Sequence, residues 1–259
     1  MSRFANLETA AQGHDAVRVD PRMLRDEHHF IALAEDAFRS ARFELAMRFY
    51  SRALETDPNC QAGWSGQVRS LLELGELDEA RVWAAKALES FRDHRELLAS
   101  RAVACARLGH SAKAFAFSDA AVQQPQPTAW VWISRGEIML ATGRGTDAFC
   151  FDKARELANG DWLPPLLVAR AYLYYRNPGR GLQWAREAQA IKPDTAFSAH
   201  VIGACNDALG HHDAARAAYA QALDLDRDFP PTRAALDTHA RMTWKDHAIA
   251  AWKHWRNRP

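Results

Sequence analysis

The chain has 259 residues, 48% of them hydrophobic, and its 33 Lys and Arg nearly balance its 32 Asp and Glu, which gives a formal net charge of +1. This hydrophobic fraction is typical of a folded protein and excludes a disordered chain. The balanced charge disfavours sequence-independent nucleic-acid binding, which needs a strongly basic surface. We therefore expect no nucleic-acid partner.

The four cysteines lie far apart, at Cys60, Cys105, Cys150 and Cys205. This scatter is typical of small packing residues in a reducing compartment, and no pair has the spacing of a CxxC motif. The N-terminus lacks the apolar core of a signal peptide, and no stretch approaches the length of a membrane span. These patterns predict a cytoplasmic protein without a membrane span.

Residues 1–20 are weakly patterned, and we expect an N-terminal tail there, either frayed or with a short helix. The pair Asp20-Pro21 predicts the start of a helix that runs to about Ser40, because Asp is a good N-cap and Pro suits a first helical turn. A region of helical repeats is therefore expected over residues 21–242.

A period of about 34 residues can be followed from Glu27 onward. The expected units are 27–60, 61–94, 95–128, 129–161, 162–195 and 196–229, followed by a half-unit at 230–242. A glycine recurs in the expected turn of four units, at Gly75, Gly109, Gly143 and Gly210. A small residue recurs where the second helix of each unit begins, at Ala46, Ala80, Ala114, Ala148, Gly181 and Ala215. Glycine suits a sharp turn, and small residues let two helices approach closely.

This pattern resembles the tetratricopeptide repeat over about residues 27–229. The resemblance rests on Trp64, Ala80, Ala84 and Ala87 in the second unit, on Leu33, Ala34, Ala46, Tyr50, Ala53 and Pro58 in the first, and on Ile202, Gly203, Ala215, Tyr219 and Ala222 in the sixth. It implies an all-α fold, an α-solenoid that winds as a right-handed superhelix of about six helix-turn-helix units with a C-terminal capping helix.

The fourth and fifth units depart from the pattern. Ala154 comes one residue early, so we expect an irregular helix or a shifted junction near Asn159-Gly160. Pro164-Pro165 fits the first turn of a helix, where proline is tolerated.

The last segment, residues 243–259, opens with a capping box at Thr243 and places Trp244, Trp252 and Trp255 on one helical stripe. A helix that covers the last repeat is the favoured interpretation, because a solenoid needs a terminal cap. The alternative is a docking helix, through which the chain binds a partner or associates with itself as a homo-oligomer.

The sequence shows no pattern typical of a catalytic site. It contains no phosphate-binding glycine loop and no Gly-x-Ser-x-Gly elbow, and its adjacent His pairs do not share a helical face. We therefore expect no enzyme activity, no catalytic residues, no metal and no cofactor.

In proteins of the resembling family, the first helix of each unit lines a concave groove that binds a protein or peptide. By position, the resemblance assigns to this groove Glu35, Arg39, Ser65, Arg69, Glu73, Arg107, Trp130, Glu137, Arg170, Tyr174 and His200. Arg and aromatic residues are favoured at binding hot spots. For each single residue the alternative is solvent exposure or packing against the next unit.

Two further patterns concern this groove. The Lys and Asn residues with which some family members hold the carboxylate of chaperone tails are missing here, so we do not expect chaperone-tail recognition. Three polar residues in register, Gln67, Arg101 and Arg135, predict either a ladder with Glu73, Glu96 or Glu137, or a polar strip that binds an acidic partner.

The predicted function is a non-catalytic scaffold or adaptor that binds a protein segment in its groove. The first alternative is an accessory or regulatory subunit of an enzyme or secretion complex, or a protein that self-associates through its ends. The second alternative is an enzyme.

Overall fold

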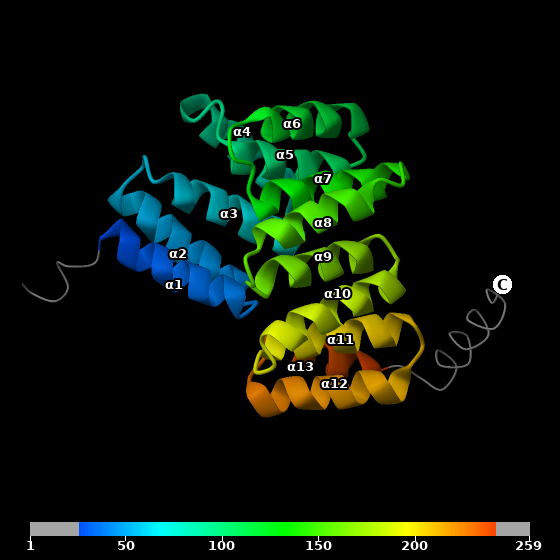
Figure 1. Ribbon diagram of the computed structural model, residues 1–259. Helices are drawn as coiled ribbons and strands as arrows, with labels where there is room; N and C mark the ends of the chain where they lie inside the picture. Colours follow the sequence, from blue (N-terminus) through cyan, green and yellow to red (C-terminus); the bar gives the residue numbers. More distant parts are fainter. Residues whose placement is uncertain (1–25, 242–259) are drawn as a thin grey trace, which may run out of the picture.

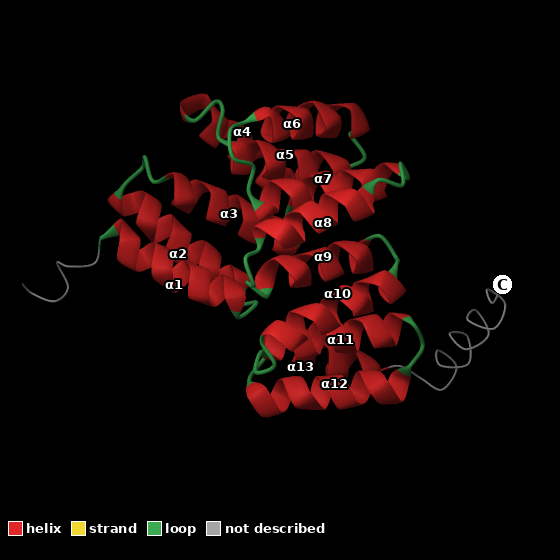
Figure 2. Ribbon diagram, in the orientation of Figure 1, coloured by secondary structure: helices red, strands yellow, loops and turns green. Residues whose placement is uncertain are grey.

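The structure, a computed structural model, describes residues 26–241 of the chain. Within this range the backbone forms thirteen α-helices and no strand (Figures 1 and 2). The helices are α1 (Glu27–Arg39), α2 (Phe43–Thr56), α3 (Gln61–Leu74), α4 (Leu77–Ser90), α5 (Arg95–Arg107), α6 (Ser111–Gln123), α7 (Ala129–Thr142), α8 (Asp147–Leu157), α9 (Leu163–Tyr174), α10 (Pro178–Ile191), α11 (Ala196–Ala208), α12 (His212–Leu225) and α13 (Pro230–Arg241).

The first twelve helices form six pairs, each joined by a turn of two to four residues. The first helices α1, α3, α5, α7, α9 and α11 pack on one another in sequence and form an inner layer. The second helix of each pair packs on the first helix of the next pair and lies outside this layer. The predicted all-α repeat solenoid is thus confirmed.

The helix that we expected to begin at Asp20-Pro21 begins only at Glu27, so that prediction was wrong for this helix. Asp26 has an extended backbone, and its side chain accepts a hydrogen bond of 3.0 Å from the backbone N–H of His29. This N-cap satisfies a donor of the first turn and fixes the start of α1. Residues 20–25 lie outside the described residues.

Small residues mark the close approaches between helices, as predicted. Ala46, Ala80 and Ala114 are completely buried. A Cβ added to Gly66 on α3 would overlap the ring of Tyr50 on α2. The four predicted turn glycines all have positive φ, between 65° and 82°, which a side chain would strain.

The fourth unit contains one wrong prediction and one confirmed prediction. Ala148 is exposed, and Asp147, which is only 5% exposed, takes the packing position instead, four residues before Phe151, just as Ala215 lies four residues before Tyr219. The reason is that Phe151 packs on Gly136, as Tyr50 packs on Gly66, and this contact sets the register of α8 one residue earlier than Ala148 would require. The predicted irregular junction is present, because Asn159 and Gly160 both have positive φ after the end of α8.

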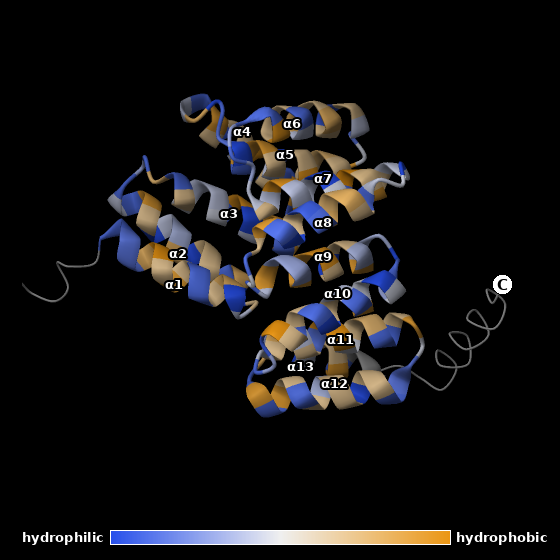
Figure 3. Ribbon diagram, in the orientation of Figure 1, coloured by the Kyte–Doolittle hydropathy of each residue, from blue (hydrophilic) through white to orange (hydrophobic). Residues whose placement is uncertain are grey.

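The two prolines predicted for a first helical turn, Pro164 and Pro165, lie at the start of α9. No helix within residues 26–241 has both the length and the apolar character that a membrane span requires. Every helix carries both hydrophobic and hydrophilic residues (Figure 3). The largest completely buried side chains include Tyr172, Phe151 and Phe197.

The first unit, α1 and α2, also contacts units that are distant in the sequence. Figure 1 shows α1 and α2 beside the middle of the stack that runs from α4 to α12, at the level of α9 and α10. Arg39, Arg42 and Phe43 of the first unit face Asp161, Asp226 and Phe197, and we call this contact the seam. In an ordinary solenoid each repeat touches only its neighbours. The seam therefore closes this superhelix onto itself.

The two ends of the chain lie outside the described residues. The predicted tail at residues 1–20 and the predicted capping helix at 243–259, with Trp244, Trp252 and Trp255, stay predictions. Helix α13 follows the sixth pair as a single helix.

Candidate binding pocket on the inner face

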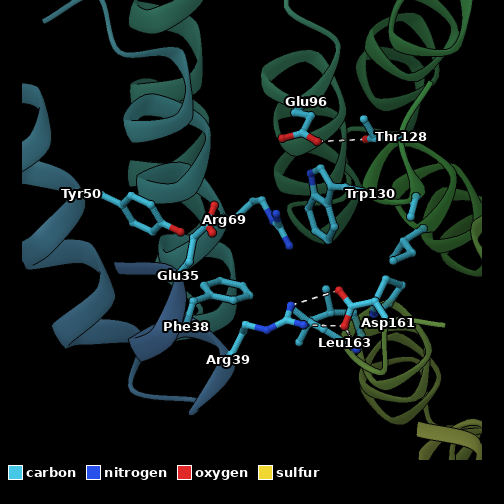
Figure 4. Close-up of a pocket in the computed structure, with 14 residues that line it drawn as sticks. Glu35, Phe38, Arg39, Tyr50, Arg69, Glu96, Thr128, Trp130, Asp161 and Leu163 are labelled. Atoms are coloured by element: carbon cyan, nitrogen blue, oxygen red, sulfur yellow. Dashed lines mark hydrogen bonds and ion pairs between the residues drawn. The ribbon is translucent and has the colours of Figure 1, made fainter. Parts of the chain in front are cut away.

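A pocket of about 250 Å³ lies on the inner face, where the first helices of five units converge. Phe38 of α1, Tyr50 of α2 and Arg69 of α3 form one wall (Figure 4). Trp130 of α7 and Leu163 of α9 lie opposite. The pocket thus has aromatic side chains on both sides, with the guanidinium of Arg69 between Phe38 and Trp130, residue types that are favoured at binding hot spots.

Arg69 occupies the centre of this pocket. Its guanidinium carbon lies 5.0 Å from the ring centroid of Phe38 and 4.7 Å from that of Trp130, so it stacks between two rings from different units. Its Nε is buried without a hydrogen-bond partner, and no ion pair of Arg69 occurs among the described residues. Trp130 is held in place because its Nε1 donates to Oγ of Ser100 at 2.9 Å.

One end of the pocket is closed by an ion pair. Arg39 donates to both carboxylate oxygens of Asp161, at 3.1 and 2.5 Å. Asp161 also accepts a hydrogen bond of 3.1 Å from the backbone N–H of Leu163, at the start of α9. The bidentate geometry fixes both partners, so this end of the pocket is a defined wall.

At its other end the pocket continues into a second one of about 390 Å³. The two pockets share Glu35, Tyr50, Arg69 and Glu96, and Ser65 lines the second. Burial raises the pKa of Tyr50 to about 12, so its phenol stays protonated at neutral pH and can donate a hydrogen bond. Together the two pockets form a trough lined by hydrogen-bond donors, acceptors and aromatic rings.

A buried ion pair lies deeper in the inner layer. Arg107 donates to the two oxygens of Glu137 at 2.5 and 3.1 Å and to the carbonyl oxygen of Leu72 at 2.8 Å. Burial alone would lower the pKa of Arg107, but the Glu137 carboxylate more than offsets it and raises that pKa. The pair joins α3, α5 and α7, so it supports the inner layer.

Three other predicted residues lie further along the inner layer. Arg170 binds Glu73, with Nε at 2.7 Å from Oε2. Tyr174 is half exposed, and its ring lies under the guanidinium of Arg107. His200 is packed between the rings of Tyr219 and Phe229 and shares a hydrogen bond of 3.0 Å with Thr232. Burial, and then the charge of Arg170, lower the pKa of His200 to about 4.

The structure therefore divides the predicted groove residues into three groups. Glu35, Arg39, Ser65, Arg69 and Trp130 line the trough. Glu73, Arg107, Glu137 and Arg170 bind one another in pairs. Tyr174 and His200 lie away from the trough.

Sequence reasoning missed several residues of the pocket, among them Phe38 and Asp161. Phe38 has the spacing of a core residue of α1, and Asp161 lies in a loop that no helical periodicity marks. Neither position carried a signal, because Phe38 meets Arg69 of the next unit and Asp161 meets Arg39 of a distant unit, and both are contacts between repeats.

The predicted ladder of Gln67, Arg101 and Arg135 with Glu73, Glu96 or Glu137 was wrong. Gln67 donates to Ser51 on α2 at 3.1 Å, Arg101 stacks over Phe117 on α6, and Arg135 pairs with Asp119 on α6. All three side chains turn toward second helices, whereas the three glutamates face the inner layer.

Within residues 26–241 no three His, Cys, Asp or Glu side chains are grouped in a way that could hold a metal ion. Cys105, Cys150 and Cys205 are buried as free thiols, and burial raises the pKa of each, to about 12 for Cys205.

Stacked helix pairs with short turns and an inner layer of first helices define an α-helical repeat solenoid. The family model of the tetratricopeptide repeat matches residues 198–229, the sixth pair. The structure is similar to that of a thermophilic tetratricopeptide repeat protein of Thermus thermophilus, with a TM-score of 0.52 and 17% identity over 74% of this chain and 99% of that chain. The predicted resemblance to the tetratricopeptide repeat is thus confirmed by the family model in the sixth pair, and the similar structure confirms the repeat fold.

Two other solved structures match less well. A tetratricopeptide repeat protein from Parabacteroides merdae has a TM-score of 0.49 and 16% identity, over 80% of this chain and 80% of that one. Pseudomonas aeruginosa PilF has a TM-score of 0.42 and 17% identity, over 82% of this chain and 97% of that one.

Proposed function

We propose that this protein is a non-catalytic scaffold that binds a segment of a partner protein in the trough on its inner face. The observation that carries the proposal is Arg69, a guanidinium stacked between Phe38 and Trp130 with no ion-pair partner among the described residues. A cation that two rings hold in place loses little side-chain entropy when it binds. The donors and acceptors around it, Tyr50, Glu35 and Glu96, suit the mixed polarity of a peptide.

The size of the trough limits what it can hold. Its two parts have volumes of about 250 and 390 Å³, and the Arg39–Asp161 pair closes one end. A partner therefore inserts a few side chains and does not run along the whole inner face. Arg107 and Glu137 line neither pocket and form an ion pair with each other, so their role in this proposal is to support the helices.

The test is affinity capture from the native cell followed by mass spectrometry, with wild-type protein and Arg69→Gln. We expect Arg69→Gln to lose most of a specific partner, because it removes the central cation. The matched control is Arg101→Gln, which also removes an Arg stacked on an aromatic ring but lies outside both pockets. Equal recovery of the same partner by all three proteins would refute binding in the trough.

Two finer expectations stay predictions. The cytoplasmic localisation rests only on sequence patterns. Self-association through the C-terminal segment concerns residues outside those described, and sedimentation of the full chain and of a chain that ends at Arg241 would compare their oligomeric states.

A further inference from the structure

The seam is held at its edges by two ion pairs between residues that are far apart in the sequence. Arg39 binds Asp161 across 122 positions, and Arg42 donates to Asp226 at 2.8 Å across 184 positions. All four side chains are between 27 and 42% exposed. Ion pairs at this exposure are individually weak and are screened by salt.

An aromatic contact fills the centre of the seam. The rings of Phe43 and Phe197 meet edge to face with centroids 5.8 Å apart, and both residues are buried. The guanidinium of Arg170 lies 5.4 and 5.3 Å from these two centroids. Glu73 on α3 holds Arg170 in this position.

The packing around these contacts is incomplete. A pocket of about 250 Å³ lies beside Asp36, Trp162 and Phe197, and another of about 480 Å³ lies beside Phe43 and Pro230. Within residues 26–241, α1 and α2 pack extensively on each other and α2 on α3, but neither packs closely on α9, α11 or α13. A few side chains thus join the first unit to the distant units, whereas continuous helix packing joins neighbouring units. The seam is therefore a weaker interface than the packing of the first unit on α3.

The inner pocket has one wall on each side of this weak interface. Phe38, Arg39 and Tyr50 belong to the first unit, and Trp130 and Leu163 belong to the opposite stack. Moving the first unit away would separate the walls, uncover the pocket and remove Phe38 from Arg69. A ligand that touches both walls would bind only the closed form and would stabilise it.

We propose that the first unit is a cover that swings on its packing against α3, and that the Arg39–Asp161 and Arg42–Asp226 pairs with the Phe43–Phe197 contact are the latch that closes it over the inner pocket. The idea that this movement controls the access of a partner rests on the proposed function of the trough. The opening itself is a property of this chain alone and is tested without a partner.

Distances between paired spin labels report the opening directly. Labels at Arg48→Cys on α2 and Asp224→Cys on α12, two exposed positions outside the latch, span the seam. A reference pair at Lys113→Cys and Asp224→Cys lies within the stack. Cys60→Ser removes the one native cysteine that is not buried. In 20 mM NaCl the seam pair should give one dominant distance, and in 1 M NaCl a second, longer distance should grow while the reference pair stays unchanged.

The variant Arg39→Gln/Arg42→Gln should produce the longer distance without added salt. Two half-exposed ion pairs should change the opening equilibrium about two- to thirtyfold. The matched control, Arg81→Gln/Arg216→Gln, removes two ion pairs within single helices away from the seam and should leave the distances unchanged. If the double variant fails to fold, the salt series on the wild-type latch decides the question.

Access to the pocket gives an independent readout. Ile133 lines the pocket and is 1% exposed, so the thiol of Ile133→Cys should react slowly with a thiol reagent. Its rate should rise about two- to thirtyfold in the latch variant, by the same factor as the opening equilibrium. An unchanged distance distribution and an unchanged thiol rate, in the variant and in 1 M NaCl, would overturn the proposal. If Arg69→Gln loses the partner but the spin-label distances and the thiol rate show no opening, the proposal that the first unit moves is refuted. The proposed binding of a partner in the trough then still stands.

Discussion

At the scale of single residues, burial determines the protonation state of several polar side chains in the inner layer. His200 is the clearest of them, since it lies between two aromatic rings and close to Arg170, and its pKa falls to about 4. The neutral imidazole forms a hydrogen bond with the hydroxyl of Thr232. A protonated imidazole would instead be a second buried cation beside Arg170.

This shift makes stability depend on pH. In the unfolded chain the His200 pKa is near 6.5, so between pH 6.5 and pH 4 the unfolded state binds more protons than the folded state. The stability contributed by neutral His200 is complete above pH 6.5 and is lost as the pH falls, by about 2 kcal/mol at pH 5.

Urea unfolding at pH 7 and pH 5 measures the effect. His200→Gln should remove most of this loss, and His110→Gln, which changes an exposed imidazole, should keep it. A wild-type difference that His200→Gln leaves intact would assign the pH dependence to other groups.

At the scale of helices, the sequence predicts the repeat because small residues mark the positions where two helices approach each other closely. Turn glycines and small residues at fixed spacing predicted the helix pairs, since two helices meet closely only where side chains are small. The prediction failed in the fourth unit, where Phe151 packs on Gly136 and Asp147 therefore occupies the place expected for Ala148. The early Ala154 indicated this shift, but Asp147 did not fit the expected small apolar residue, because an Asp is buried only where partners such as Tyr172 and Arg180 donate to it.

The close approach of α2 and α3 leads to a prediction for Gly66. In Gly66→Ala the new Cβ would overlap the Tyr50 ring, so either the ring or α3 must move. We expect a loss of about 1–3 kcal/mol in the free energy of unfolding, typical of an overpacked core, measured by urea denaturation.

Gly179→Ala is the matched control for this substitution. Gly179 also lies in a helix, but nothing lies near its added Cβ, so we expect a change of less than about 1 kcal/mol, and in the stabilising direction. Equal effects of the two substitutions would show that helix approach is not the cause.

At the scale of the whole molecule, closure of the superhelix decides which residues form the pocket. The family resemblance predicted that first helices line the inner face, and it supplied Arg69 and Trp130. The resemblance could not predict the place of Asp161 in the pocket or the Phe43–Phe197 contact, because both depend on how far the superhelix curves. Curvature sums small rotations over many units, and no local pattern records that sum.

Closure also predicts how the molecule loses structure locally. Amides of α1 and α2 should exchange with solvent faster than those of α7 and α9, because the first unit is held by its packing on α3 and by the seam alone. In 1 M NaCl the protection of α1 and α2 should fall while that of α7 and α9 stays, as hydrogen exchange read by mass spectrometry would show. Uniform exchange in all units, or a uniform salt effect, would contradict this prediction.

The seam also fixes the number of repeats. An open solenoid gains or loses a unit at little cost, because each unit contacts only its neighbours. Here an additional unit anywhere between α3 and α8 would displace Asp161, Phe197 and Asp226 from Arg39, Phe43 and Arg42 by one full step of the superhelix. Repeat arrays usually diverge in length by duplication or deletion of a repeat. Here such a change would break the seam and separate the walls of the pocket. Selection for a superhelix that is closed by the seam would therefore preserve the number of repeats as well as the residues of the seam.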